Sequence, residues 1–335
     1  MVSVRLFGFF LSVFFISFTA SSAISQDLTT RPSPESGPTI VTVRMVVLNI
    51  DQIKGADQSY VADIAFRADW QDDRLRHEGS TTKRVDLSDI WHPGFQILNQ
   101  LKLTFTFAND AEVSPDGSVR IIQRAWGSYS QPLELVDFPF DTQALKITLV
   151  SPGHEKGTVA LRENVEEPSR IADSFSIPDW DTVSWSSKAT EREIFEGEQV
   201  LPTFEATIVM KRNSRYYFIN VILPLFLIIC MSWIVFWIPS TEMGPRISVS
   251  VTAMLTLTAY RFAIGASLPK IAYLTRLDWF ILGSSFLVFI SLLEVVITSK
   301  LARSEKKSAA RKLNVAMRYA APITFLLISY LSLFR

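Results

Sequence analysis

The stretch SVSVTAMLTLTAYRF, residues 248–262, carries five Ser and Thr side chains inside an apolar block. In a helix, residues spaced three or four apart share one face. That spacing places six residues on one face: Ser248, Thr252, Leu255, Ala259, Phe262 and Ala266. Hydroxyl groups at one end and bulky apolar groups further along suit a water-filled passage with an apolar constriction. One helix cannot enclose water, so this interpretation requires several copies of the chain around an axis.

The hydroxyl groups have a second interpretation. Ser and Thr side chains in membrane helices also bond back to their own backbone or hold neighbouring helices together. The graded order, with hydroxyls first and then Leu255 and Phe262, favours the pore. Arg261 lies about 120° from Leu255 around a helix with about 100° per residue, so it falls off the predicted pore face.

Four apolar segments are long enough to cross a hydrocarbon core of roughly 30 Å. They cover residues 218–238, 247–268, 279–299 and 313–334. The linker between the third and fourth segments holds six basic residues against Glu305 alone, and basic residues in short loops mark the cytoplasmic side. Four crossings return the chain to its starting side, so we expect the soluble half and the C-terminus outside.

The N-terminal half has three predicted parts. Residues 1–23 have the basic, apolar and small-residue pattern of a secretory signal peptide, and residues 24–38 are expected to form a flexible leader. Short alternating runs separated by turns predict an extracellular antiparallel β-sandwich of immunoglobulin type over residues 39–213. Residues 214–335 complete the chain as a transmembrane domain of four helices with a short cytoplasmic linker between the third and the fourth.

Composition excludes several classes of function. The chain has 335 residues, 20% of them charged, with 33 basic and 33 acidic residues, so a nucleic-acid partner is not suggested. The three histidines lack metal-ligand spacing, and neither a phosphate-binding loop nor a nucleophile elbow occurs. Cys230 has no intrachain partner for a disulfide. We therefore expect neither an enzyme nor a bound metal or cofactor.

Five motifs in order resemble one family: FRADWQDDRL (66–75), WHP (91–93), PDGSV (115–119), FPFD (138–141) and KRNSRYYFINVILP (211–224). With LPK (268–270) after the pore-like face and four apolar segments, the chain from about Val41 onward resembles the pentameric ligand-gated ion channels, the Cys-loop receptor superfamily. It is most similar to the bacterial branch, because Gln131 and Leu145 stand where the disulfide of other members would lie.

The resemblance implies a homopentamer, a ring of subunits in a bacterial inner membrane with the N-terminal domain in the periplasm. Permeant ions would pass when a small-molecule agonist binds between subunits, and membrane lipids would surround the helices. The resemblance also implies a gating interface where the two domains meet, although the same residues could simply fasten the domains together. These residues are Pro139, Asp141, Arg212, Pro269 and Lys270.

The ligand site implied by the resemblance lies between neighbouring sandwiches. Gln96, Pro152 and Leu201 stand where the family usually carries aromatic residues. The candidates are therefore Phe66, Arg67, Phe95, Arg124, Trp126 and Phe195. Two guanidinium groups near an aromatic ring suit a carboxylate ligand, whereas ordinary ion pairs between strands would explain the arginines equally well.

Charge selectivity has two interpretations. A ring of Glu242 at the inner mouth would attract cations. Gly244-Pro245-Arg246 is partly similar to the Pro-Ala-Arg of the anion-selective glycine and GABA receptors, but its proline sits one position later. We favour cations. The alternative function is a membrane-anchored periplasmic sensor that passes no ions, although such an anchor needs no graded polar face. A transporter is disfavoured because paired repeats and broken helices are lacking.

Overall fold

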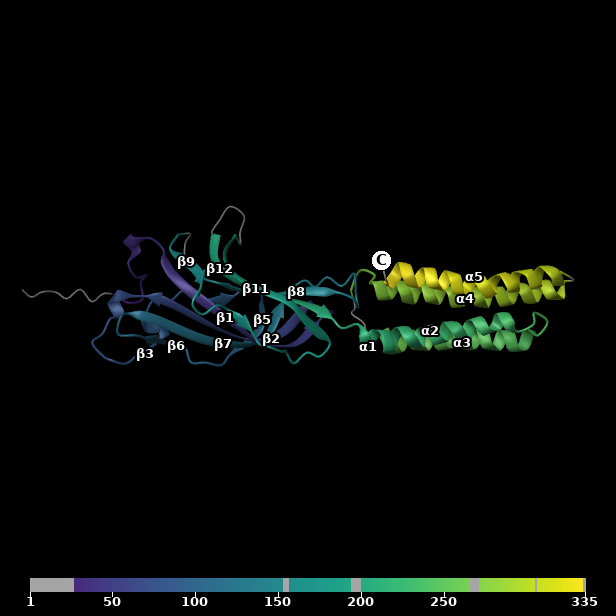
Figure 1. Ribbon diagram of the computed structural model, residues 1–335, viewed down its shortest axis with the longest axis horizontal. Helices are drawn as coiled ribbons and strands as arrows, with labels where there is room; N and C mark the ends of the chain where they lie inside the picture. The colour runs from purple at the N-terminus through teal and green to yellow at the C-terminus, as the bar shows by residue number, and fades with distance from the viewer. Residues whose placement is uncertain (1–26, 153–156, 194–199, 266–270, 305, 334–335) are drawn as a thin grey trace, which may run out of the picture.

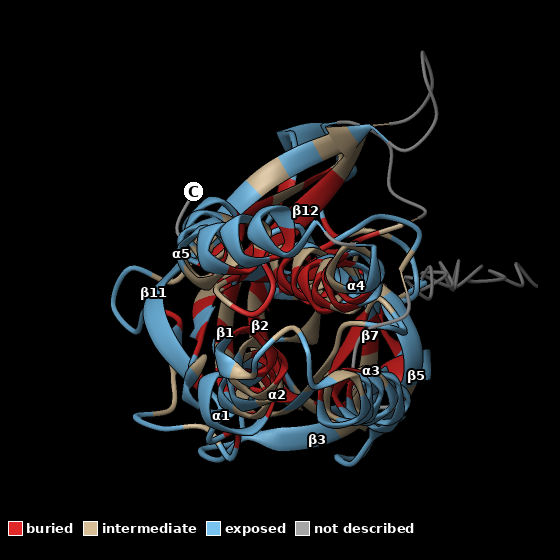
Figure 2. Ribbon diagram, turned by 90° about the vertical axis from the view of Figure 1, so that its right-hand side faces the viewer, coloured by how far each residue is buried: buried red, intermediate tan, exposed pale blue. Residues whose placement is uncertain are grey.

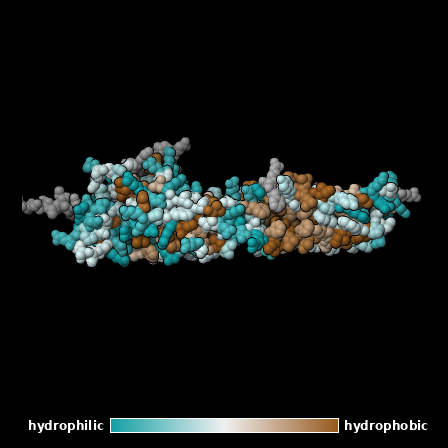
Figure 3. All heavy atoms as spheres, viewed as in Figure 1, coloured by the Kyte–Doolittle hydropathy of each residue, from teal (hydrophilic) through white to brown (hydrophobic). Residues whose placement is uncertain are grey.

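The computed structural model describes residues 27–152, 157–193, 200–265, 271–304 and 306–333. The molecule is elongated, with a β-sandwich at one end and a helical bundle at the other (Figure 1). Apolar residues gather over the helical end, whereas hydrophilic residues cover most of the sandwich (Figure 3). The predicted signal peptide, Phe195, Ala266, Pro269 and Lys270 lie outside the described residues.

The sandwich consists of two sheets. The larger runs in the order β10-β1-β2-β7-β6-β3, with β9 also on β1 and β5 also on β7, and the smaller runs β11-β12-β8-β4. The predicted β-sandwich is confirmed, and its pairs are antiparallel except that β9 and β10 lie parallel to β1. The strands are β1 (Thr39–Lys54), β2 (Ser59–Gln71), β3 (Lys83–Asp86), β4 (Gln96–Ile97), β5 (Gln100–Phe105), β6 (Asp110–Val113), β7 (Ser118–Ser130), β8 (Thr142–Val150), β9 (Val159–Glu163), β10 (Arg170–Ile171), β11 (Trp180–Glu193) and β12 (Val200–Arg212).

Alternation of side chains along the strands builds the core between the sheets. In β1, Val41, Val43, Met45 and Val47 are all buried, because every second residue of a strand points to the same face. Part of the predicted leader, residues 27–38, also contacts the sandwich. The Arg74 guanidinium donates to the backbone carbonyls of Asp27 and Thr30, at 3.1 and 2.8 Å.

The bundle contains four helices that are long and apolar enough to cross a membrane. The first span, Arg215–Trp237, joins α1 (Arg215–Tyr217), the π-helical turn η4 (Phe218–Ile222), α2 (Leu223–Trp233) and the 3-10 turn η5 (Ile234–Trp237). The others are α3 (Met243–Gly265), α4 (Arg276–Arg303) and α5 (Lys307–Leu333). Figure 2 views the bundle from its end and shows buried residues concentrated on α4.

Each helix begins three to six residues before its predicted apolar segment, and side-chain capping can stabilise such a start. The start of α4 shows how. Thr275 Oγ1 accepts a hydrogen bond from the Asp278 N–H at 3.1 Å, and Asp278 Oδ2 accepts one from the Thr275 N–H at 2.9 Å. This reciprocal capping box satisfies backbone donors that the helix itself cannot pair. It fixes the start of α4 directly beneath the sandwich.

Candidate pore and gating interface

The predicted pore face of α3 is uncovered in the single chain. Its described members, Ser248, Thr252, Leu255, Ala259 and Phe262, are all exposed, and Leu255 and Phe262 are 65% and 82% exposed. A different stripe of α3 is buried against the rest of the bundle: Arg246, Ser250, Ala253 and Leu257. The helix therefore has two distinct faces, and the hydroxyl-bearing face is available to line an axis shared with other subunits.

One hydroxyl of α3 bonds back to the helix backbone, as the second interpretation of the Ser and Thr residues expected. Thr258 Oγ1 donates to the Met254 carbonyl one turn earlier, at 2.9 Å. Thr258 does not belong to the predicted pore face. A local back-bond thus accounts for this hydroxyl, while Ser248 and Thr252 lie on the exposed stripe.

Arg246 points into the bundle. Its side chain is 0% exposed, and its guanidinium donates to Glu294 Oε2, Thr298 Oγ1 and Asn314 Oδ1 at 3.0, 2.8 and 3.0 Å. Glu294 and Thr298 come from α4 and Asn314 from α5, so the arginine joins three helices. The partial similarity to Pro-Ala-Arg therefore places no free cation on the predicted pore face.

The same cluster reaches the end of the first span. Asn314 Nδ2 and Arg318 Nε both donate to the Phe236 carbonyl in η5, at 2.9 and 2.7 Å. The Arg318 guanidinium also lies over the Trp237 ring, 5.7 Å from its centre. Sequence reasoning did not find this cluster. Glu294 was the residue in the sequence that could have revealed the cluster, because an acidic residue in an apolar span needs a partner.

Two predicted residues of the gating interface form a buried ion pair. Asp141 Oδ1 lies 2.7 Å from Arg212 Nε, and Asp141 Oδ2 lies 3.2 Å from Arg212 Nη2. Their side chains are only 1% and 6% exposed. Gln143 Nε2 donates to Asp141 Oδ2 at 2.8 Å, and the Arg212 guanidinium stacks 4.2 Å from the centre of a Trp180 ring. The pair fixes the FPFD turn to the end of β12, which leads directly into the first span.

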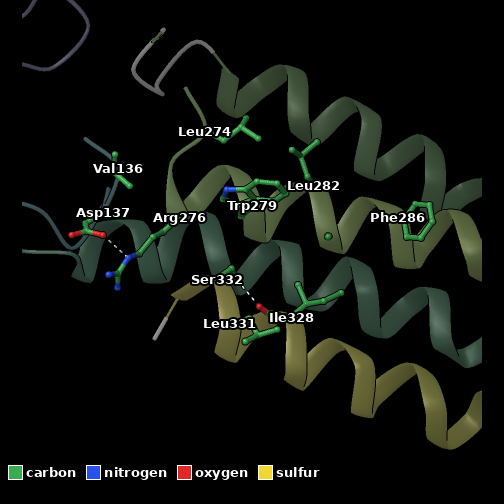
Figure 4. Close-up of a pocket in the computed structure, with 11 residues that line it drawn as sticks. Val136, Asp137, Leu274, Arg276, Trp279, Leu282, Phe286, Ile328, Leu331 and Ser332 are labelled. Carbon is green, nitrogen blue, oxygen red and sulfur yellow. Dashed lines mark hydrogen bonds and ion pairs between the residues drawn. The ribbon is translucent and has the colours of Figure 1, made fainter. Parts of the chain in front are cut away.

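Contacts between the sandwich and α4 were missed from the sequence. Arg276 Nε pairs with Asp137 Oδ1 at 2.7 Å, and the Arg276 N–H donates to the Val136 carbonyl at 2.9 Å. The Tyr273 hydroxyl accepts the Leu135 N–H at 3.0 Å. Figure 4 shows the Arg276–Asp137 pair beside a cavity of about 840 Å³, which is lined mainly by apolar side chains of α4 and α5. The segment before FPFD thus contacts α4 directly.

The predicted ligand residues fall on two faces of the larger sheet. Phe66 is 5% exposed and packs edge-on against Phe95, with ring centres 5.9 Å apart. Arg67 follows it on β2 and therefore points to the opposite, outer face. Arg124 and Trp126 of β7 are partly exposed, and pairing with β2 places them on the outer face with Arg67. Phe66 therefore does not stand beside the arginines, contrary to expectation.

Both arginines have carboxylate partners. Arg124 contacts Asp63 through two hydrogen bonds of 3.0 and 2.6 Å, and this carboxylate raises the pKa of Arg124 above its ordinary value. Arg67 lies 2.8 Å from both Asp69 and Glu167. In this conformation both arginines therefore form ion pairs, as the alternative interpretation of the sequence expected. Arg124 nevertheless keeps a side chain that is 43% exposed, against 18% for Arg67, so it is the more accessible guanidinium.

Comparison with known proteins agrees with this architecture. Residues 23–214 match the neurotransmitter-gated ion-channel ligand binding domain, and residues 221–326 match the neurotransmitter-gated ion-channel transmembrane region. The chain therefore belongs to the family of pentameric neurotransmitter-gated ion channels. It is a multi-pass membrane protein and a ligand-gated ion channel rather than an enzyme.

Two kinds of relative have similar sequences. The proton-gated ion channel of Gloeobacter violaceus is 24% identical over 314 residues, which cover 92% of this chain and 87% of that protein. The glycine receptor subunit beta of Rattus norvegicus and that of Homo sapiens are each 24% identical over 305 residues. That alignment covers 88% of this chain and 61% of the receptor subunit.

Proposed function

We propose that the protein is a homopentameric, cation-preferring channel of a bacterial inner membrane, opened by a small molecule that binds between its periplasmic β-sandwiches. The observation that carries this proposal is the pair of faces on α3. The exposed face bears hydroxyls and then bulky apolar groups, while the buried face bears Arg246 in an ion pair with Glu294. Both features favour passage of cations. The exposed face offers hydroxyl groups to the ions, and the ion pair with Glu294 neutralises the positive charge of Arg246 inside the bundle, away from that face.

Each pore residue has a role in this proposal. Ser248 and Thr252 form the narrow hydrated part, and Leu255 and Phe262 form rings that close the pathway by dewetting. Ala259 and Ala266 leave room between and beyond these rings. Glu242, exposed just before α3, provides a ring of carboxylates at the cytoplasmic mouth. Such a ring concentrates cations and repels anions.

The gating interface transmits ligand binding to the pore. The buried Asp141–Arg212 pair ties the FPFD turn, with Pro139, to the strand that continues into the first span. Pro269 and Lys270 would complete the interface beyond α3. A movement of the sandwich would then reach the helices through a rigid, desolvated contact rather than through a flexible linker.

The ligand site is proposed on the outer face of the larger sheet, at the border with a neighbouring subunit. Arg124 and Trp126 form its most accessible part, and Arg67 lies on the same face. A ligand carboxylate there would compete with Asp63 for the Arg124 guanidinium. Phe95 and Phe195 would contribute from the opposite side of the site, and Phe66, on the inner face of β2, would contribute only through its contact with Phe95.

Ion flux into liposomes tests the proposal. Purified protein is reconstituted with opposed potassium and chloride gradients and exposed to acid, glycine, other small carboxylates and amines. Acid and glycine are included because one relative is a proton-gated ion channel and another is a glycine receptor subunit. We expect one of these stimuli to evoke potassium flux. Ligand binding without flux of either ion would instead indicate the non-conducting sensor, and chloride flux alone would contradict the cation preference.

A further inference from the structure

The first membrane span contains a proline in its helical interior. Pro224 has no backbone N–H, so the Asn220 carbonyl four residues earlier lacks the donor that a regular helix would supply. At this point the chain forms the π-helical turn η4, in which the Leu223 N–H reaches back five residues to the Phe218 carbonyl. Such turns are rare and often occur at functional sites.

A side chain of the pore helix supplies the missing donor. Tyr260 Oη lies 3.0 Å from the Asn220 carbonyl oxygen and 2.8 Å from that of Val221. The hydroxyl has one proton, which it donates to these two acceptors. Freed carbonyls within a bilayer are satisfied by neighbouring helices because water is absent there. The interruption at Pro224 and the position of Tyr260 are thus complementary.

This bond connects the sandwich to the predicted gate by a short path. The strand β12 ends at Arg212, which is bound to Asp141, and the first span begins three residues later. On the other side of the bond, Tyr260 lies between Leu255 and Phe262 in the sequence of α3. A displacement of η4 would therefore act on the pore helix close to both apolar rings.

We propose that Tyr260 is a positioning residue for gating, whose hydroxyl couples the proline-interrupted turn of the first span to the pore helix. This inference rests on the proposed channel function. The hydroxyl stabilises one conformation of the pore helix relative to η4, so its removal shifts the equilibrium between closed and open states. Ion preference is unaffected, because Tyr260 is not on the predicted pore face.

A double-mutant cycle between Tyr260→Phe and Pro224→Ala tests the coupling. Pro224→Ala restores an N–H that can bond the Asn220 carbonyl, which makes the tyrosine hydroxyl redundant. Thermal midpoints of the purified oligomers are compared first. We expect Tyr260→Phe to lower the midpoint when residue 224 is proline and to leave it nearly unchanged when residue 224 is alanine. Additive effects of the two substitutions would overturn the proposed bond.

Gating is measured in the Leu255→Ser background, where resting current needs no added ligand. We expect Tyr260→Phe to change the ratio of open to closed time about threefold or more, the effect of one neutral hydrogen bond. Reversal potentials should not move. The control is Tyr319→Phe, which removes a hydroxyl from a side chain on α5 that is 68% exposed.

Two outcomes separate failure of this inference from failure of the proposed function. An unchanged open ratio in a conducting Leu255→Ser, Tyr260→Phe channel would refute the gating role of Tyr260 while leaving the channel intact. A Leu255→Ser protein that passes no current would contradict the proposed gate and the gating role with it. The thermal cycle would still decide whether the hydroxyl and the proline are coupled.

Discussion

Replacing Glu294 with glutamine should destabilise the bundle strongly. The substitution keeps the shape of the side chain but removes the charge that faces Arg246, whose side chain is 0% exposed. Breaking one partner of a buried ion pair costs about 3–5 kcal/mol. We expect a value of about 3 kcal/mol here, at the lower end, because the oxygens of Thr298 and Asn314 still accept from the guanidinium.

The thermal midpoint of the purified oligomer measures this effect, with Glu242→Gln as the control because Glu242 is an exposed carboxylate on the same chain. Replacing both Arg246 and Glu294 with methionine should restore much of the midpoint, because apolar pairs of similar size often replace buried ion pairs without loss. The double variant should also keep the reversal potential of the parent. A Glu294→Gln midpoint equal to that of the parent would refute the buried pair. A reversal potential that moves toward the cation equilibrium in the double variant would place Arg246 in the pathway.

Three further predictions concern the mouth, the ligand face and pH. Glu242→Gln should reduce the preference for cations, seen as a shift in reversal potential in a salt gradient, and a parent that already prefers chloride would contradict the assignment. Arg124→Ala should raise the activating ligand concentration about tenfold, whereas Arg67→Ala should mainly lower thermal stability. Normal dose–response curves for both variants would show that the two arginines serve only as structural ion-pair partners. Burial lowers the pKa of His92 below its ordinary value of 6.5, and its Nδ1 accepts the Gly94 N–H at 3.0 Å. The unfolded chain therefore binds this proton more readily, so stability is full above pH 6.5 and falls as pH falls. His92→Gln should flatten that decline, and an identical pH dependence of the thermal midpoint would exclude the histidine as its source.

Periodicity in the sequence predicted much of the architecture. The positions of the four spans follow from apolar length alone, and the uncovered face of α3 follows from spacings of three and four residues. Asp141 and Arg212 were both placed at the gating interface through the family resemblance, but their ion pair was not predicted. Nothing in the local sequence indicates that residues so far apart in the chain would form a buried pair.

The errors and omissions have physical causes. Phe66 was grouped with Arg67 although neighbouring residues of a strand point to opposite faces, so the two-residue period could have separated them. Arg246 could not be assigned to the bundle interior, because its partners Glu294 and Asn314 come from two later helices. The pairing of Arg276 with Asp137 likewise depends on how the sandwich sits over α4, which no periodic pattern encodes.

The central claim is that the exposed face of α3 lines the ion pathway, and one matched pair of variants tests it most directly. Leu255 is 65% exposed and Leu257, two positions away, is 1% exposed. Resting current is recorded from cells expressing Leu255→Ser or Leu257→Ser at equal surface density. We predict a large resting current for Leu255→Ser, because a polar ring removes the dewetting barrier, and none above the parent for Leu257→Ser. A Leu255→Ser channel as silent as the parent, or equal currents from the two variants, would contradict the account.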